Sequence, residues 1–75
     1  VGGGAMAQAD DSAARERERL ERELAGAEAQ LAATRARLAN DAFVRQAPPA
    51  VVEGTRTRQA ELTEQVRRLA ARLRA

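Results

Sequence analysis

The sequence contains no cysteine and no histidine, and these two absences exclude several kinds of chemistry. Without cysteine the chain has no disulfide framework and no thiolate that could act as nucleophile or metal ligand. Without histidine it lacks the side chain that most often transfers protons near neutral pH and most often binds metals. We therefore expect no catalytic residue and no metal site, and a cysteine-free chain suits a cytoplasmic protein.

Aromatic residues and long apolar runs are also scarce. One phenylalanine is the only aromatic side chain among 75 residues. No apolar run approaches the roughly 20 residues needed to span a bilayer. The opening VGGGAMAQADD has neither the basic start nor the apolar stretch of a signal peptide. We expect no membrane association, and we interpret residues 1–11 as a flexible leader or linker.

The sequence is instead rich in charged residues, which make up 32% of the chain, and in alanine and leucine. This composition is typical of a long helix or coiled coil rather than a globular enzyme. All 13 basic residues are arginine, although the net charge is only +2. Arginine is well suited to bidentate contacts with phosphate, but a coding bias toward arginine explains its use equally well.

Side chains recur in a heptad pattern, at alternating steps of four and three residues, in two segments. The first segment, about residues 12–39, carries Leu20, Leu24, Ala27, Leu31, Thr34 and Leu38. The second, about residues 49–74, carries Val52, Thr55, Gln59, Leu62, Val66, Leu69 and Leu73. Such spacing predicts two coiled-coil helices. Gly26 and Gly54 fall on exposed heptad positions, where each costs ~1 kcal/mol relative to alanine.

A loop of about residues 40–48 separates the two helices. We expect Asn40 to end the first helix in the left-handed conformation and the prolines Pro48 and Pro49 to sit at or before the start of the second. Helices joined by so short a connection fold back on each other. The predicted fold class is therefore all-α, with two long helices forming an antiparallel coiled-coil hairpin.

One register satisfies both heptad stripes, because pairs of residues whose numbers add up to 93 always set an a position against a d position. The pairs are Leu20 with Leu73, Leu24 with Leu69, Ala27 with Val66, Leu31 with Leu62, Thr34 with Gln59, and Leu38 with Thr55. The polar layer of Thr34 and Gln59 either fixes this register or reflects tolerance near a frayed tip.

Charges are unevenly distributed in this register. Glu23 should face Arg72 near the open end, whereas Arg35 should face Arg56, and Arg37 should face Arg58, near the loop. Residues 34–58 hold five arginines and two acidic residues, a net charge of +3, and the remainder holds eight arginines and nine acidic residues. A bound polyanion would explain this basic end, and a solvated charged face explains it equally well. The candidate RNA-binding residues are Arg35, Arg37, Arg45, Arg56 and Arg58.

The loop carries Phe43 and Val44, an apolar pair in a polar setting. One interpretation is an apolar plug that closes the end of the hairpin. The other is a ring presented for stacking on an exposed base. Asn40 and Pro48 complete the loop residues that shape the turn or contact RNA.

The run LANDAFVRQAPPAVV, between the leucine heptads, resembles the C-terminal coiled-coil arm of valyl-tRNA synthetases. The matching positions are Leu38, Ala39, Asn40, Asp41, Phe43, Val44, Ala47, Pro48, Val51 and Val52, and the resemblance extends over about residues 13–75. It implies a non-catalytic arm that contacts the outer corner of tRNA, where the D and T loops meet, and assists aminoacylation. Three features depart from the family: arginine or uncharged residues where lysine is frequent, Gly54 in place of a charged helix former, and the N-terminal leader.

The resemblance also implies the partners. These are a valine-specific tRNA and the remainder of the synthetase, a valine ligase whose ATP and valine would bind elsewhere, so this chain needs no cofactor. The alternative function is a protein-interaction or dimerising coiled coil with no RNA role, and weak self-association is expected of so small a seam. A terminal coiled coil of a ribosome-associated ATPase is a further alternative, but it gives no reason for the Phe-Val and Ala-Pro loop.

Overall fold

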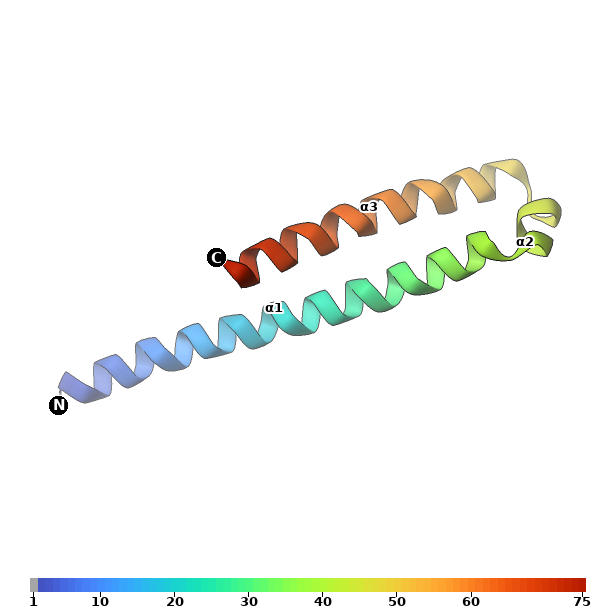
Figure 1. Cartoon of the computed structure of the whole chain (residues 1–75). Coiled ribbons are helices and arrows are strands. Elements are labelled where there is room, and N and C mark those ends of the chain that lie inside the picture. Colours follow the sequence, from blue (N-terminus) through green and yellow to red (C-terminus); the bar gives the residue numbers. More distant parts are fainter. Residues whose placement is uncertain (1) are drawn as a thin grey trace.

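Three helices form a hairpin in the computed structural model, which describes the backbone of residues 2–75 and the side chains of residues 11–75. They are α1 (Gly2–Ala39), α2 (Asp41–Gln46) and α3 (Pro49–Arg74). The long helices α1 and α3 lie side by side and antiparallel, and α2 connects them at one end (Figure 1). The molecule is a rod of 66 × 16 × 15 Å. The predicted all-α helical hairpin is confirmed.

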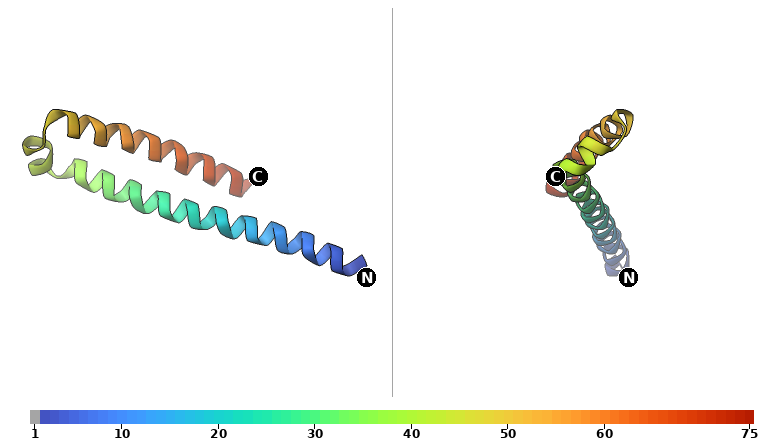
Figure 2. Two further views of the ribbon diagram at one scale, coloured as in Figure 1. Left: turned by 180° about the vertical axis from the view of Figure 1, so that it is seen from behind. Right: turned by 90° about the vertical axis from the view of Figure 1, so that its right-hand side faces the viewer.

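The helix α1 is longer at its N-terminus than the sequence predicts, because it begins at Gly2 and not near residue 12. Extending an existing helix adds one backbone hydrogen bond per residue without the cost of a new nucleus. As a result α1 projects beyond the C-terminal end of α3 (Figure 1, Figure 2). The predicted leader falls almost wholly on residues 1–10, whose side chains lie outside the described part of the structure, and it stays a prediction.

The core is a single row of side chains along the seam between α1 and α3. Six of the predicted stripe positions are buried: Leu20, Ala27, Leu31, Val52, Leu62 and Leu69. The remaining stripe positions are half-buried: Leu24, Thr34, Leu38, Thr55, Gln59, Val66 and Leu73. Leu24, Val66 and Leu73 pack against the cluster of Leu20, Ala27 and Leu69, as the predicted pairing requires. The heptad pattern therefore locates the whole core.

In the polar layer of Thr34 and Gln59, the threonine hydroxyl bonds within its own helix. The Thr34 hydroxyl donates to the backbone carbonyl oxygen of Gln30 at 2.8 Å. Among residues 11–75 no buried side-chain nitrogen or oxygen lacks a hydrogen-bond partner. Because the Thr34 hydroxyl bonds within α1 and not across the seam, it favours tolerance of a polar layer over a hydrogen bond that specifies register.

Leu62 tests the seam most directly, since its side chain is only 1% exposed. Replacing Leu62 with alanine should lower the free energy of unfolding by about 2–5 kcal/mol, because the transfer and cavity terms add. Thermal unfolding followed by circular dichroism measures this loss. The control is Val51→Ala, at a position 48% exposed, which should change stability by no more than about 0.5 kcal/mol. Equal effects of the two substitutions would contradict the assigned seam.

Candidate nucleic-acid interface at the hairpin tip

A short helix occupies the segment that was expected to be an irregular loop. Asn40 precedes α2 in extended backbone, at φ −82° and ψ 107°, and its side-chain oxygen accepts hydrogen bonds from the amides of Ala42 (3.0 Å) and Phe43 (3.4 Å). The prediction of a left-handed Asn40 is therefore wrong, and among the described residues none has a positive φ. Asparagine followed by acidic Asp41 is a helix-start signal, and it could have revealed α2 from the sequence.

Pro48 directs the chain from α2 into α3. The amide of Ala47 donates to the Phe43 carbonyl at 2.9 Å and ends α2. Pro48 then adopts φ −56° and ψ 143° as the residue before the first turn of α3, where a missing amide hydrogen costs nothing. Its carbonyl oxygen accepts from the amides of Val51 (2.9 Å) and Val52 (3.2 Å). The two prolines thus fix the angle at which the second long helix begins.

Phe43 and Val44 are both half-buried at the tip. The guanidinium carbon of Arg37, on α1, lies 5.9 Å from the centroid of the Phe43 ring. At this distance the positive charge is attracted to the face of the ring. The half-burial of Phe43 and its contact with Arg37 both favour a ring that closes the end of the hairpin over a ring presented for base stacking. The same contact holds the Arg37 guanidinium near the tip.

The five candidate arginines lie on all three helices around the tip: Arg35 and Arg37 on α1, Arg45 on α2, and Arg56 and Arg58 on α3. All five are exposed. Two of them have a carboxylate nearby, Arg56 with Glu53 at 3.7 Å and Arg58 with Glu61 at 3.8 Å. These distances exceed a hydrogen bond, so both guanidinium groups keep donors for another anion.

The other three arginines of the tip have no described carboxylate close to their guanidinium groups. Within the described side chains, no carboxylate lies within 4.0 Å of the guanidinium groups of Arg35, Arg37 or Arg45. Arg45 makes one long hydrogen bond, from Nε to the backbone oxygen of Asp41 at 3.4 Å. The tip therefore presents arginine donors to solvent with few local acceptors.

The contacts across the seam differ from those expected. Arg58 donates to the side-chain oxygen of Gln30 at 3.0 Å, and Arg72 contacts Glu16 at 3.5 Å. In both cases the observed partner lies one heptad closer to the N-terminus of α1 than the residue expected to face it. Arg58 is thus bound by an uncharged amide, and no contact tests whether it faces Arg37. The long arginine side chain spans the offset. No contact tests the pair of Arg35 and Arg56.

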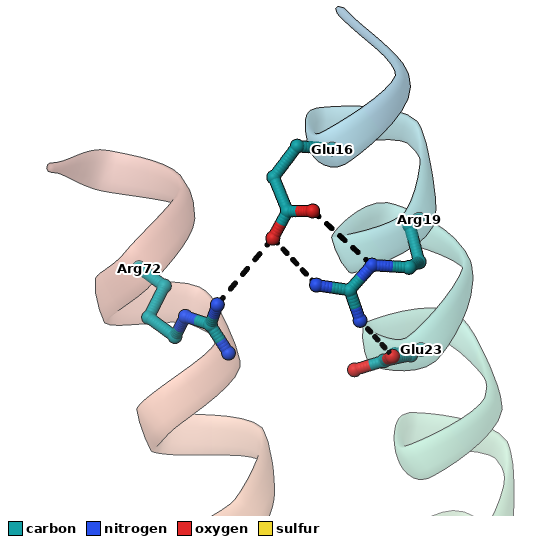
Figure 3. Close-up of polar contacts among 4 residues, drawn as sticks. All are labelled: Glu16, Arg19, Glu23 and Arg72. Atoms are coloured by element: carbon teal, nitrogen blue, oxygen red, sulfur yellow. Dashed lines mark hydrogen bonds and ion pairs between the residues drawn. The ribbon is translucent and has the colours of Figure 1, made fainter. Parts of the chain in front are cut away.

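At the open end, acidic side chains form ion pairs with Arg19 and Arg72 (Figure 3). The Glu16 carboxylate lies between Arg19 of the same helix and Arg72 of α3, and Arg19 also contacts Glu23 at 2.6 Å. The hydrogen bond from Arg19 lowers the pKa of Glu16, and the same contact raises the pKa of Arg19. Because Glu23 is already bound within its own helix, the predicted pair of Glu23 with Arg72 is wrong.

The chemistry that the hairpin offers is therefore anion binding. Among residues 11–75, no group of three or more acidic side chains lies close enough together to hold a metal ion. No described helix is long and apolar enough to cross a membrane. Exposed guanidinium groups that surround a capped turn are suited to the oxygens of a phosphate backbone.

Comparison with known proteins gives a consistent result. A family model described as "Valyl tRNA synthetase tRNA binding arm" matches residues 13–75. The chain is similar to the valine–tRNA ligase of Mycolicibacterium paratuberculosis (strain ATCC BAA-968 / K-10), with 50% identity over 60 residues, covering 80% of this chain and 7% of that protein. It is also similar to the valine–tRNA ligase of Mycobacterium tuberculosis (strain ATCC 25618 / H37Rv), with 48% identity over 62 residues, 83% of this chain and 7% of that protein.

The valine–tRNA ligase of Nocardia farcinica (strain IFM 10152) is 47% identical over 58 residues, 77% of this chain and 6% of that protein. The chain thus spans about 7% of the length of the first two of these relatives. No solved structure matches.

The Asn40 cap should stabilise the tip independently of the seam. Replacing Asn40 with alanine leaves the amides of Ala42 and Phe43 without their acceptor, and we expect a loss of about 1 kcal/mol in the free energy of unfolding. Amide hydrogen exchange should quicken in α2 while the protection of the seam residues in α1 is kept. Gln46→Ala, at the exposed other end of α2, serves as the control. Unchanged exchange at Ala42 and Phe43 would show that the cap is dispensable.

Proposed function

The chain belongs to the family of valyl-tRNA synthetase tRNA-binding arms, and we propose that it holds the outer corner of a valine-specific tRNA for its synthetase. The matched region is a non-catalytic part of a ligase, so the arm assists aminoacylation by binding alone. In this proposal ATP and valine bind elsewhere in the synthetase. The remainder of that enzyme is the arm's protein partner, and the enzyme is cytoplasmic.

The observation that carries this proposal is the net charge of +3 on residues 34–58, against −1 on the remainder of the chain. At the open end, Glu16 and Glu23 bind arginines within and across the helices. At the tip, Arg35, Arg37 and Arg45 lie beyond ion-pair distance of the described carboxylates. Uncompensated like charges destabilise a free hairpin, and a bound phosphate backbone would remove that cost. The proposed RNA contacts are therefore Arg35, Arg37, Arg45, Arg56 and Arg58.

A protein-interaction coiled coil is less well supported. Among residues 11–75, Val51 is the one large hydrophobic side chain that is strongly exposed, at 48%. Stable dimer interfaces need a contiguous apolar core, which a single exposed valine does not supply. Weak self-association of the isolated hairpin stays a proposal that sedimentation can test.

Charge removal at the tip tests the proposed RNA contacts. The tip variant replaces four arginines with glutamine: Arg35, Arg37, Arg56 and Arg58. Each lost phosphate contact should reduce the slope of log affinity against log salt by about 0.7–0.9, and the affinity for tRNA should fall at low salt. Fluorescence anisotropy with a labelled tRNA transcript measures both quantities, and aminoacylation by the complete synthetase measures the effect on kcat/KM.

The control variant removes the same charge from the other half of the rod. It replaces four arginines that have no carboxylate within 4.0 Å among the described side chains: Arg15, Arg22, Arg68 and Arg74. It should bind tRNA nearly as tightly as the unmodified chain. A tip variant that keeps both its affinity and its salt slope, or a control variant that loses as much as the tip variant, would refute the proposed contacts.

A further inference from the structure

Each long helix contains one interior glycine within the hairpin, Gly26 in α1 and Gly54 in α3. Neither has a positive φ, and a Cβ atom added at either position would meet nothing within 4 Å. Glycine weakens the interior of a helix relative to alanine. The packing of the hairpin therefore does not require glycine at either position.

The surroundings of the two glycines differ. On the surface of α3, Gly54 lies between Val51, three residues before it, and Arg58, four residues after it. Val51 is 48% exposed, and Arg58 is held in place by its hydrogen bond to Gln30. Arg37, on α1, lies at the same end of the rod, where its guanidinium is over the Phe43 ring. Gly54 is thus a position without a side chain between an exposed valine and an arginine.

Gly26 offers the same bare backbone in an acidic part of the rod. On α1 it lies between Glu23, three residues before it, and Gln30, four residues after it. Glu23 belongs to the ion-paired cluster of the open end, where it contacts Arg19. Gly26 is therefore a matched control, since it shares the helical setting and the open space of Gly54 but lies in the part of the chain whose net charge is −1.

We propose that Val51, Gly54 and Arg58, together with Arg37, form a surface on which an RNA ribose–phosphate backbone approaches α3 closely; this rests on the proposed tRNA-binding function. The missing Cβ of Gly54 lets a second backbone come nearer to the helix than any other residue allows. The guanidinium groups of Arg37 and Arg58 would donate to phosphate oxygens on either side of it. The exposed valine would cover the apolar face of a ribose. Charge complementarity thus selects RNA, and not an acidic or apolar protein surface, as the occupant.

The test compares Gly54→Ala with Gly26→Ala in this chain and in the complete synthetase. Both substitutions should raise the melting temperature by a similar amount, about 4–8 °C, because alanine favours the helix in each case. Only Gly54→Ala should weaken binding of a tRNA transcript, by about three- to tenfold, and the bulkier Gly54→Gln should weaken it further. Adding Arg58→Gln to Gly54→Ala should cost less than the sum of the two separate losses, because both act on the same contact.

The outcomes separate this inference from the proposed function. If the unmodified chain binds tRNA and Gly54→Ala binds it equally well, the close approach is refuted while the tRNA-binding function stands. If Gly26→Ala loses as much affinity as Gly54→Ala, the effect comes from helix stiffness, and the close approach is again refuted. If neither the unmodified chain nor the synthetase that carries it binds tRNA, the proposed function itself fails.

Discussion

The antiparallel register of one leucine seam determines where every other feature of this hairpin lies. Two helices have no second layer against which to pack, so the side chains between α1 and α3, such as Leu31 and Leu62, are the whole core. A slip of one heptad would expose apolar residues at both ends and would separate Arg72 from Glu16 and Arg58 from Gln30. The seam thus stabilises the hairpin, and its register determines where the charged side chains lie.

With that register in place, the rod has two chemically different ends. The open end carries ion pairs within α1 and across to α3 in a part of the chain with little net charge, whereas the tip combines a net positive charge with a capped turn. Three local features shape the tip: the Asn40 cap, the contact of Arg37 with the Phe43 ring, and Pro48 before the first turn of α3. A preformed basic turn at the end of a rod suits the proposed contact with a folded tRNA, since little conformational freedom is lost on binding.

The core could be predicted from the sequence because burial of leucine and valine every three or four residues has few competing explanations. Features with small energies were harder to predict. Asn40 follows the last residue of α1, as predicted, but it caps α2 in extended backbone and does not adopt the left-handed conformation, since an asparagine side chain caps amides readily. Glu23 binds Arg19 and not Arg72. Its partner was hard to predict because the energies of exposed ion pairs within and across helices differ by only about tenths of a kcal/mol. The net positive charge of the tip could nevertheless be predicted, because it depends on the positions of the charged residues along the rod and not on the partner of each one.

The central claim is that the tip, and not the open end, faces the tRNA. The absence of cysteine allows a direct test, because one cysteine introduced by substitution carries a photo-activated cross-linker to a single place. Gln46→Cys puts it on the exposed end of α2, and Ala71→Cys puts it at an exposed position near the open end of α3. We expect cross-links to bound tRNA from position 46 and few from position 71. Equal yields, or a higher yield from position 71, would contradict it.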